Sequence, residues 1–440
     1  MGTREEEEEK SVPLLLEEEV SSERGRGRIN RKASSAQTLG NIIVSIVGTG
    51  ILGLPYAFRI AGWLAGSLGV ILAGISTYYC MLLLVECKEK LEREEGTRGE
   101  EAVAEEVGIG TYGDLGEKAF GRRGRILTES IVLISQCGGA VTYLVFIAQN
   151  LLSIFSTSTL TFSSFVFLLI PVEIALSWIR SLPALAPFSA MADVFIVLAM
   201  VIVVKDELHL LGKKRRRREA VTSLGGLPFA AGVAIFCFEG FSLTLPLQTS
   251  MKERQRFPLV LSLAIMGITT VYLCFGLLGY LAYGEETRDI ITLNLPNDWS
   301  SVAVKVGLCI GLSLTFPIMM HPVHEIVEAR LKATTNGRLK KLCYDMEQGT
   351  ERVGVYIFRG ISVVALALVA SFVPGFGLMI SLVGSTFCAL LSFVLPAAFH
   401  LIFMSACLNI WQRSLDIFIL VFGILFACYG TYNAVSSASN

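Results

Sequence analysis

Long apolar stretches, each sufficient to cross a lipid bilayer as a helix, follow one another along most of this 440-residue sequence. A spanning helix needs roughly 20 apolar residues, because its backbone N–H and C=O groups must pair inside the segment where no water is available. The stretches predict about eleven spans. They lie near residues 38–58, 63–87, 126–153, 160–178, 187–204, 226–248, 258–283, 302–323, 354–373, 377–403 and 415–434. We therefore expect an all-α polytopic membrane protein embedded in a lipid bilayer.

The composition supports this class and excludes others. Hydrophobic residues make up 53% of the chain and charged residues 17%, which is too apolar for a soluble protein of this length. The ten cysteines contain no CxxC pair, and the four histidines form no sequence cluster. We predict no metal site, no disulfide framework, no cofactor and no nucleic-acid partner. An enzyme is not expected, because no nucleophile motif or phosphate loop is present.

The N-terminal segment differs from the rest of the chain. Residues 1–36 combine an acidic run, Glu5 to Glu9, with a basic cluster, and such a composition predicts a disordered cytoplasmic tail. The transmembrane domain is expected over 37–436. Within the tail, Glu9 precedes Leu14 and Leu15, which is similar to an acidic dileucine sorting signal, and no N-x-S/T glycosylation site is present. A vacuolar or other endomembrane location is therefore favoured over the plasma membrane.

Basic residues in the connecting loops predict the orientation, since Lys and Arg flanking a span stay on the cytoplasmic side. A cytoplasmic N-terminus places most basic loops inside, such as the loop with Arg122 and Arg123 and the loop with Lys340 and Lys341. One run disagrees. Residues 213–218 are all basic and follow the fifth span, on the predicted non-cytoplasmic side. A wrong number of earlier spans would also explain this disagreement.

Helix-weakening residues interrupt two of the spans. The first contains Gly48, Gly50 and Gly53 followed by Pro55, and the sixth contains Glu239 beside Gly240. Two interrupted helices in corresponding positions are typical of an inverted-repeat transporter whose substrate site lies at the repeat interface. We expect a 5+5 inverted repeat over about 38–204 and 226–403, with an extra helix at about 415–434.

An unwound turn inside the membrane leaves backbone N–H and C=O groups that need partners, and the ammonium and carboxylate groups of an amino acid suit them. Glu239 is the candidate proton carrier, because burial disfavours its ionised form and alternating access then permits protonation on one side and release on the other. Two simpler interpretations stand beside these. The glycines can serve close helix packing, and Glu239 can merely accept hydrogen bonds from backbone amides of its own turn. Further ionisable residues in or near the spans are equally compatible with interhelical hydrogen bonds or interfacial positions; they are Glu173, Asp193, His321 and His400.

Several blocks resemble the amino acid/auxin permease family. They include QTLGNIIVSIVGTGILGLPYAF, TYGDLGEKAFG, GVAIFCFEGFSLTLPLQ, GYLAYGEETRDIITLNLP, TFPIMMHPVHEIVE and VPGFG, and the resemblance covers nearly all of the chain after residue 34. Within that family the blocks are most similar to plant transporters of aromatic and neutral amino acids, and plant vacuolar amino acid transporters are related. The resemblance implies a LeuT-related fold of eleven helices with broken helices one and six, proton-coupled transport, and neutral and aromatic amino acids, with auxin as a further candidate substrate.

The resemblance also implies substrate-binding positions. The family's first unwound segment corresponds to Gly48, Thr49, Gly50, Ile51, Leu52 and Gly53, and the second corresponds to Phe236, Cys237, Phe238, Glu239 and Gly240. Tyr143 and Thr315 are added as polar groups in the spans that face the site in this fold. Proton-coupled animal relatives carry a histidine on helix one where this chain has Asn41, so the identity of the proton carrier stays open.

Two alternatives remain. A sodium-coupled amino acid transporter would share the broken helices. A transporter-like sensor would bind amino acids without moving them, but residues 1–36 contain no recognisable signalling domain. An ion channel is disfavoured, because neither a pore signature nor an arginine ladder is present.

Overall fold

The computed structural model of the chain describes residues 33–98, 109–155, 159–179, 182–213, 218–296, 298–333 and 353–439. The helices are α2 (Ser35–Ile46), α3 (Leu54–Ala61), α4 (Trp63–Arg98), α5 (Tyr112–Ile154), α6 (Phe162–Ser177), α7 (Leu182–Lys213), α8 (Leu227–Cys237), α9 (Phe241–Ser250), α10 (Phe257–Tyr283), α11 (Trp299–Ala333), α13 (Val353–Phe372), α14 (Phe376–Val383), α15 (Leu395–Phe403) and α16 (Ile410–Ser439). Short 3₁₀ segments are η1 (Thr49–Gly53), η2 (Arg254–Arg256), η3 (Gly284–Glu286) and η4 (Ile291–Asn294), and π-helical segments are η5 (Gly384–Cys388) and η6 (Leu390–Val394). Within these ranges the β-structure is a single bridge, so the prediction of an all-α chain is confirmed. Residues 1–32 of the predicted tail, 1–36, lie outside the described residues. The last two residues of that predicted tail belong to α2, which begins at Ser35.

Helices occupy all eleven positions at which spans are predicted. Within the described ranges eight of them are long and apolar enough to cross a bilayer, or nine if α2 and the η1–α3 pair, bent by 47°, count as one span. The fourth predicted span is the 16-residue helix α6, which is shorter than a typical crossing. The structure therefore supports a many-helix membrane bundle, whereas the exact count of eleven stays a prediction.

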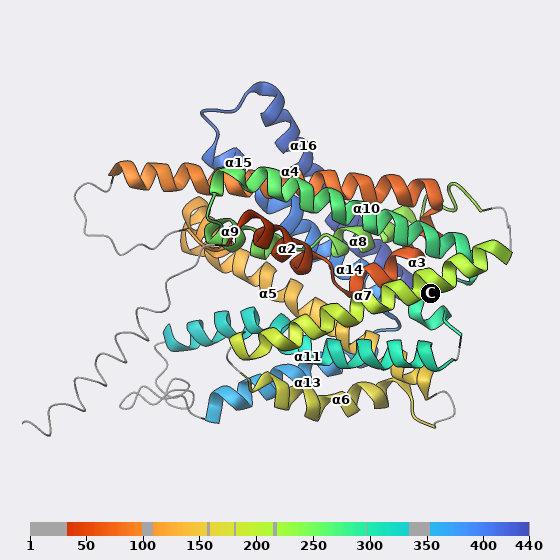
Figure 1. Cartoon of the computed structure of the whole chain (residues 1–440). Helices are drawn as coiled ribbons and strands as arrows, with labels where there is room; N and C mark the ends of the chain where they lie inside the picture. Colours follow the sequence, from red (N-terminus) through yellow and green to blue (C-terminus); the bar gives the residue numbers. More distant parts are fainter. Residues whose placement is uncertain are drawn as a thin grey trace, which may run out of the picture.

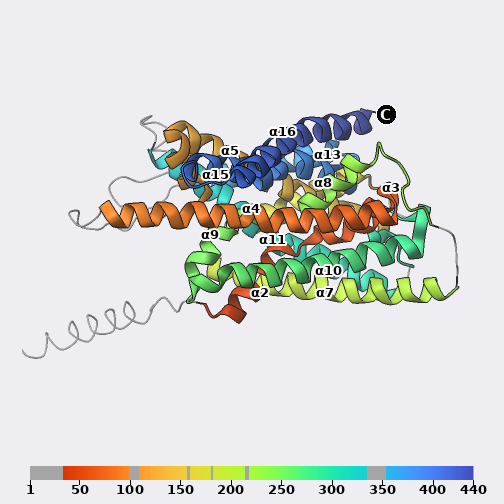
Figure 2. The same ribbon diagram turned by 90° about the horizontal axis from the view of Figure 1, so that it is seen from above.

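The bundle has two ends, which Figures 1 and 2 show from two sides. At one end the chain before α2 meets the end of α9, where the Ala33 N–H donates to the Ser250 carbonyl at 2.8 Å. At the other end the start of α4 meets the chain that follows α7, where the Trp63 N–H donates to the Glu219 carbonyl at 3.2 Å. After the fifth predicted span, the chain is therefore at the end of the bundle opposite to the end where it begins.

This arrangement concerns the basic run at 213–218, of which residues 214–217 lie outside the described residues. Arg218 lies at the end of the bundle where α4 begins, and its guanidinium donates to the Leu281 carbonyl at 2.9 Å. That end is opposite to Ala33, as the sequence count predicts. The conflict between this run and the other basic loops therefore persists in the structure.

The last helix, α16, is attached to the bundle by buried polar groups. The His400 ring of α15 lies between two carboxylates: Nδ1 is 2.7 Å from Asp416 on α16, and Nε2 is 3.3 Å from Glu86 on α4. The Tyr79 hydroxyl donates to Asp416 at 3.1 Å. The Asp416 side chain is fully buried, so these contacts supply the partners that a carboxylate removed from water requires. His400 thus makes interhelical contacts, one of the two interpretations that its sequence position allowed.

Candidate functional site

The first interruption lies where the glycines of the first span predict it. Helix α2 ends at Ile46, Gly48 is extended, and the chain resumes through η1 before α3 begins. Pro55 lies in the first turn of α3, where its missing N–H costs no helical hydrogen bond. The residues between Ile46 and Leu54 therefore leave a stretch of backbone outside α-helical pairing.

The second interruption separates α8 from α9. Helix α8 ends at Cys237, and α9 begins at Phe241, so Phe238, Glu239 and Gly240 form the turn between them. A side chain at Gly240 would clash with Ile46, because a Cβ there would lie 2.6 Å from the Ile46 Cγ1. The sixth span is thus broken where an acidic residue beside a glycine predicts it.

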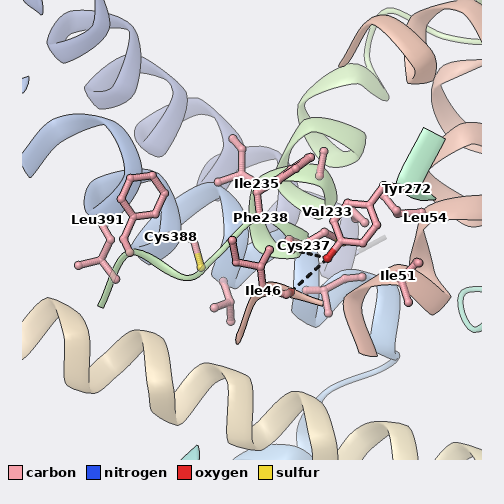
Figure 3. Packing of buried hydrophobic residues seen from close by; sticks show 14 of the residues in the cluster. Ile46, Ile51, Leu54, Val233, Ile235, Cys237, Phe238, Tyr272, Cys388 and Leu391 are labelled. Carbon is pink, nitrogen blue, oxygen red and sulfur yellow. Dashed lines mark hydrogen bonds between the residues drawn. The ribbon is translucent and has the colours of Figure 1, made fainter. Parts of the chain in front are cut away.

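The two interruptions are in direct contact. A Cβ at Gly50 would lie 3.0 Å from Sγ of Cys237, a tight contact that the glycine avoids as η1 approaches the end of α8. Figure 3 shows Tyr272 of α10 reaching both segments, with its hydroxyl 3.1 Å from the Ile46 carbonyl and 2.9 Å from the Cys237 carbonyl. Residues nearly 190 positions apart in sequence therefore form one local site.

A cavity of about 90 Å³ lies between these segments. Ligand pockets commonly measure about 300–1,000 Å³, so the cavity is small for an aromatic amino acid in this conformation. Its lining residues are Ser45, Ile46, Gly48, Thr49, Gly50, Ser135, Gln136, Gly139, Tyr143, Phe236, Cys237, Glu239, Met319 and Cys388.

The predicted site residues divide into two groups. Both segments and α5 contribute residues to the cavity wall, namely Gly48, Thr49, Gly50, Tyr143, Phe236, Cys237 and Glu239. The others do not line it; they are Ile51, Leu52, Gly53, Phe238, Gly240 and Thr315. Ile51, Leu52 and Gly53 are buried in η1, and the Phe238 ring packs on Tyr272 with centroids 5.1 Å apart. The Thr315 hydroxyl donates to the Gly311 carbonyl of its own helix at 2.6 Å.

Several lining residues were not predicted. Ser135, Gln136 and Gly139 lie on α5 in the segment SQCGG, whose small and polar residues interrupt an apolar span and were a usable signal. Cys388 lies in η5, and π-helical turns inside α-helices are frequent at functional sites. The sequence contains no pattern that predicts the π-helical turn, because this turn depends on tertiary packing.

Two polar groups of the cavity wall lack partners. Oε1 of Glu239 and the hydroxyl of Thr49 are buried, and neither has a hydrogen-bond partner among the described residues. The backbone amides of the turn do not satisfy Oε1, as the simpler interpretation of Glu239 required. Buried polar groups are normally paired, so these two atoms are suited to a ligand that brings hydrogen-bonding groups into the cavity.

Polar contacts surround the α3 side of the first interruption. Asp289 accepts hydrogen bonds from the Gln149 side chain at 3.2 Å and from the Gly377 N–H at 3.4 Å, which ties the loop before η4 to α5 and α14. A Cβ at Gly53 would lie 3.7 Å from the Asp289 carbonyl oxygen. Arg59 of α3 donates to the Thr287 carbonyl at 2.9 Å. These contacts join the chain between α10 and η4 to α3, α5 and α14 next to η1.

Other buried carboxylates lie away from this cavity. Both oxygens of Glu173 on α6 and of Glu207 on α7 are buried without hydrogen-bond partners in the described part of the chain. Asp193 is partly buried on α7, and His321 on α11 lies 3.7 Å from Glu325. None of the four lines the cavity.

Comparison with known proteins gives consistent results. The family model for transmembrane amino acid transporter proteins matches residues 31–436. Amino acid transporter ANT1 of Arabidopsis thaliana is 54% identical over 92% of this chain and 93% of its own, and AVT3C of the same plant is 36% identical over 92% and 91%. Vacuolar amino acid transporter 3 of Schizosaccharomyces pombe is 26% identical over 94% of this chain and 60% of its own.

A solved structure of Mhp1 in an inward-facing conformation matches 93% of this chain and 92% of its own, with a TM-score of 0.54 and 12% sequence identity. That likeness concerns the fold, and it agrees with the predicted LeuT-like architecture. The relatives are transporters rather than enzymes, as predicted. The chain is thus a multi-pass membrane protein that belongs to the transmembrane amino acid transporter family, also called the amino acid/auxin permease family, and transports amino acids.

Proposed function

We propose that this protein is a secondary active transporter that moves neutral and aromatic amino acids together with protons, by alternating access around the cavity between the two interrupted helices. The observation that carries the proposal is a pair of buried atoms beside unwound backbone, Oε1 of Glu239 and the Thr49 hydroxyl, which have no hydrogen-bond partner among the described residues. The proposal includes a 5+5 repeat formed by α2–α7 and α8–α15, with α16 as the extra helix.

The chemistry of the wall supports a zwitterion of low net charge. Backbone of two unwound turns offers N–H and C=O groups, and the wall contains no lysine or arginine that would select an acidic side chain. Ile46, Phe236 and Met319 supply an apolar part of the wall for an aliphatic or aromatic side chain. Auxin, an aromatic carboxylate, shares the apolar ring and the anionic group but lacks the ammonium.

The hydrogen bonds of Asp289 with Gln149 and of Arg59 with the Thr287 carbonyl support alternating access, because together they would form a seal on one side of the cavity. This seal lies on the α3 side of η1, whereas Ser45 and Ile46 line the cavity on the α2 side. An aromatic substrate would need the cavity to enlarge, which rearrangement of the half-helices about their breaks would achieve. We propose that the seal opens when the α2 side closes.

Uptake by proteoliposomes tests this function directly. We expect labelled phenylalanine or leucine to accumulate when an inward pH gradient is imposed, and to accumulate equally when Na⁺ is replaced by a large organic cation. Accumulation that requires Na⁺ and ignores the pH gradient would identify the sodium-coupled alternative. Binding without any uptake would identify a sensor.

We further propose a cytoplasmic N-terminus, a disordered tail that ends before Ala33, where the described residues begin, and a vacuolar or other endomembrane location. One relative is named a vacuolar transporter, and the dileucine pair Leu14–Leu15 follows Glu9 in a segment outside the described residues. We expect the double substitution Leu14→Ala and Leu15→Ala to move tagged protein from the vacuolar to the plasma membrane. Wild-type protein found only at the plasma membrane, unchanged by the substitutions, would refute the sorting role.

A further inference from the structure

Tyr272 lies at the point where the two interrupted helices meet. It belongs to α10, its side chain is fully buried, and its ring packs against Phe238 in an edge-to-face contact. Its hydroxyl faces the carbonyls of Ile46, the last residue of α2, and Cys237, the last residue of α8 (Figure 3). One phenol therefore serves the C-terminal ends of both half-helices.

The electrostatics of that point favour a positive charge. The C-terminal end of a helix carries roughly half a negative elementary charge, because its last carbonyls have no helical partner. Two such ends converge here within hydrogen-bonding distance of one oxygen atom, in a buried site. In transporters with broken helices, unwound carbonyls and half-helix C-termini are the groups that coordinate Na⁺ or carry H⁺.

The hydroxyl supplies a fixed substitute for a cation. Its hydrogen can point at only one carbonyl at a time, but both acceptors lie within 3.1 Å, so the donor is shared between them. The phenol is part of α10 and cannot dissociate. No carboxylate of the described residues is hydrogen-bonded to it, so an ion entering this point would have to displace the hydroxyl.

We propose that Tyr272 is a positioning residue whose hydroxyl occupies the place of a coupling Na⁺ ion, joining the carbonyl ends of α2 and α8 and making transport independent of Na⁺ at this point. The inference rests on the proposed proton-coupled function. It assigns the titrating role to a different group, such as Glu239, which lines the cavity, whereas the Tyr272 hydroxyl does not.

The test uses the full-length protein in proteoliposomes, with phenylalanine uptake measured at a fixed pH gradient in Na⁺ or in N-methyl-D-glucamine. Tyr272→Phe removes only the shared donor and leaves two buried carbonyls unsatisfied, so we expect uptake to fall about tenfold in both cations. Tyr280→Phe is the matched control, because Tyr280 is equally buried on α10 but its hydroxyl has no hydrogen bond among the described residues. It should transport like the wild type.

A second variant separates the cation's place from a purely structural role. Tyr272→Asn removes the ring, leaves room for an ion and retains an oxygen ligand, so we expect its uptake to be stimulated by Na⁺ while the wild type is indifferent. Size-exclusion chromatography and thermal melting establish that each variant is folded. If Tyr272→Phe fails to fold, the wild type and Tyr272→Asn decide the matter.

Three results would overturn the inference: a folded Tyr272→Phe protein with wild-type uptake, a folded Tyr272→Asn protein that ignores Na⁺, or a wild type that needs Na⁺ in addition to the pH gradient. A wild type that ignores the pH gradient would refute the proposed proton coupling instead. The two proposals can therefore fail separately.

Discussion

Glu239→Gln is expected to abolish the accumulation of amino acid driven by a pH gradient, while exchange of labelled for unlabelled amino acid at equal pH continues. Glutamine has nearly the same size and keeps hydrogen-bonding groups in the cavity wall, but it cannot bind and release a proton. A carboxyl group buried without a partner is costly when charged, so substrate and proton binding are expected to stabilise each other there. Accumulation and counterflow in the same proteoliposomes provide the two measurements.

Glu173→Gln is the matched control. Glu173 is also a buried carboxyl group without a hydrogen-bond partner among the described residues, but it lies on α6 and does not line the cavity. If the site determines coupling, this variant retains pH-driven accumulation. The opposite pattern, in which Glu173→Gln loses accumulation and Glu239→Gln keeps the wild-type pH dependence, would move the proton pathway to α6 and leave Glu239 a structural role.

A histidine on helix one, as in proton-coupled animal relatives, would be an alternative proton carrier to Glu239. Asn41, to which the resemblance assigns that position, is exposed on the surface of α2 and does not line the cavity. An asparagine does not titrate in the physiological range, so helix one offers no proton carrier at that position. Among the described residues that line the cavity, Glu239 is the one carboxylic acid, and none is a histidine.

The sequence predicted those features of the site that have a local cause. Glycines with a following proline weaken a helix wherever it packs, and Glu239 beside Gly240 is improbable in a plain membrane anchor, so both interruptions follow from residues within one turn. The contribution of α5 and η5 depends on which faces of separate helices meet. Thr315 illustrates the limit, because its own helix satisfies its hydroxyl and a polar residue in an apolar run need not face a ligand.

Phe238 illustrates a second limit. It lies between Cys237 and Glu239, both of which line the cavity, yet its ring turns away to pack on Tyr272. An unwound turn has neither the 3.6-residue period of a helix nor the two-residue period of a strand, so the facing of its side chains cannot be derived from spacing. Tyr272 itself was not predicted, because its proposed role depends on two backbone carbonyl oxygens. The position of backbone atoms in space cannot be derived from the residue types.

Gly50→Val is expected to reduce transport to background while the protein still inserts into the membrane. The sequence analysis assigns Gly50 to the first unwound, substrate-binding segment, and the structure adds a close neighbour from α8. A Cβ there would lie 3.0 Å from Sγ and 3.4 Å from Cα of Cys237, so a valine must push η1 away from the end of α8. Overpacking of this kind costs about 1–3 kcal/mol, and here it also separates the two halves of the substrate site.

Gly48 provides the comparison within the same segment. A Cβ at Gly48 would meet no atom within 4 Å, and the residue lines the cavity, so Gly48→Val occupies ligand space without displacing protein atoms. We expect Gly48→Val to raise the KM for large substrates more than it lowers the maximal rate, and Gly50→Val to lower the maximal rate for every substrate, since the contact between the two breaks is common to all of them. Uptake kinetics with alanine and phenylalanine distinguish the two effects. Wild-type uptake by a well-expressed Gly50→Val protein would show that the approach of η1 to α8 is dispensable for transport.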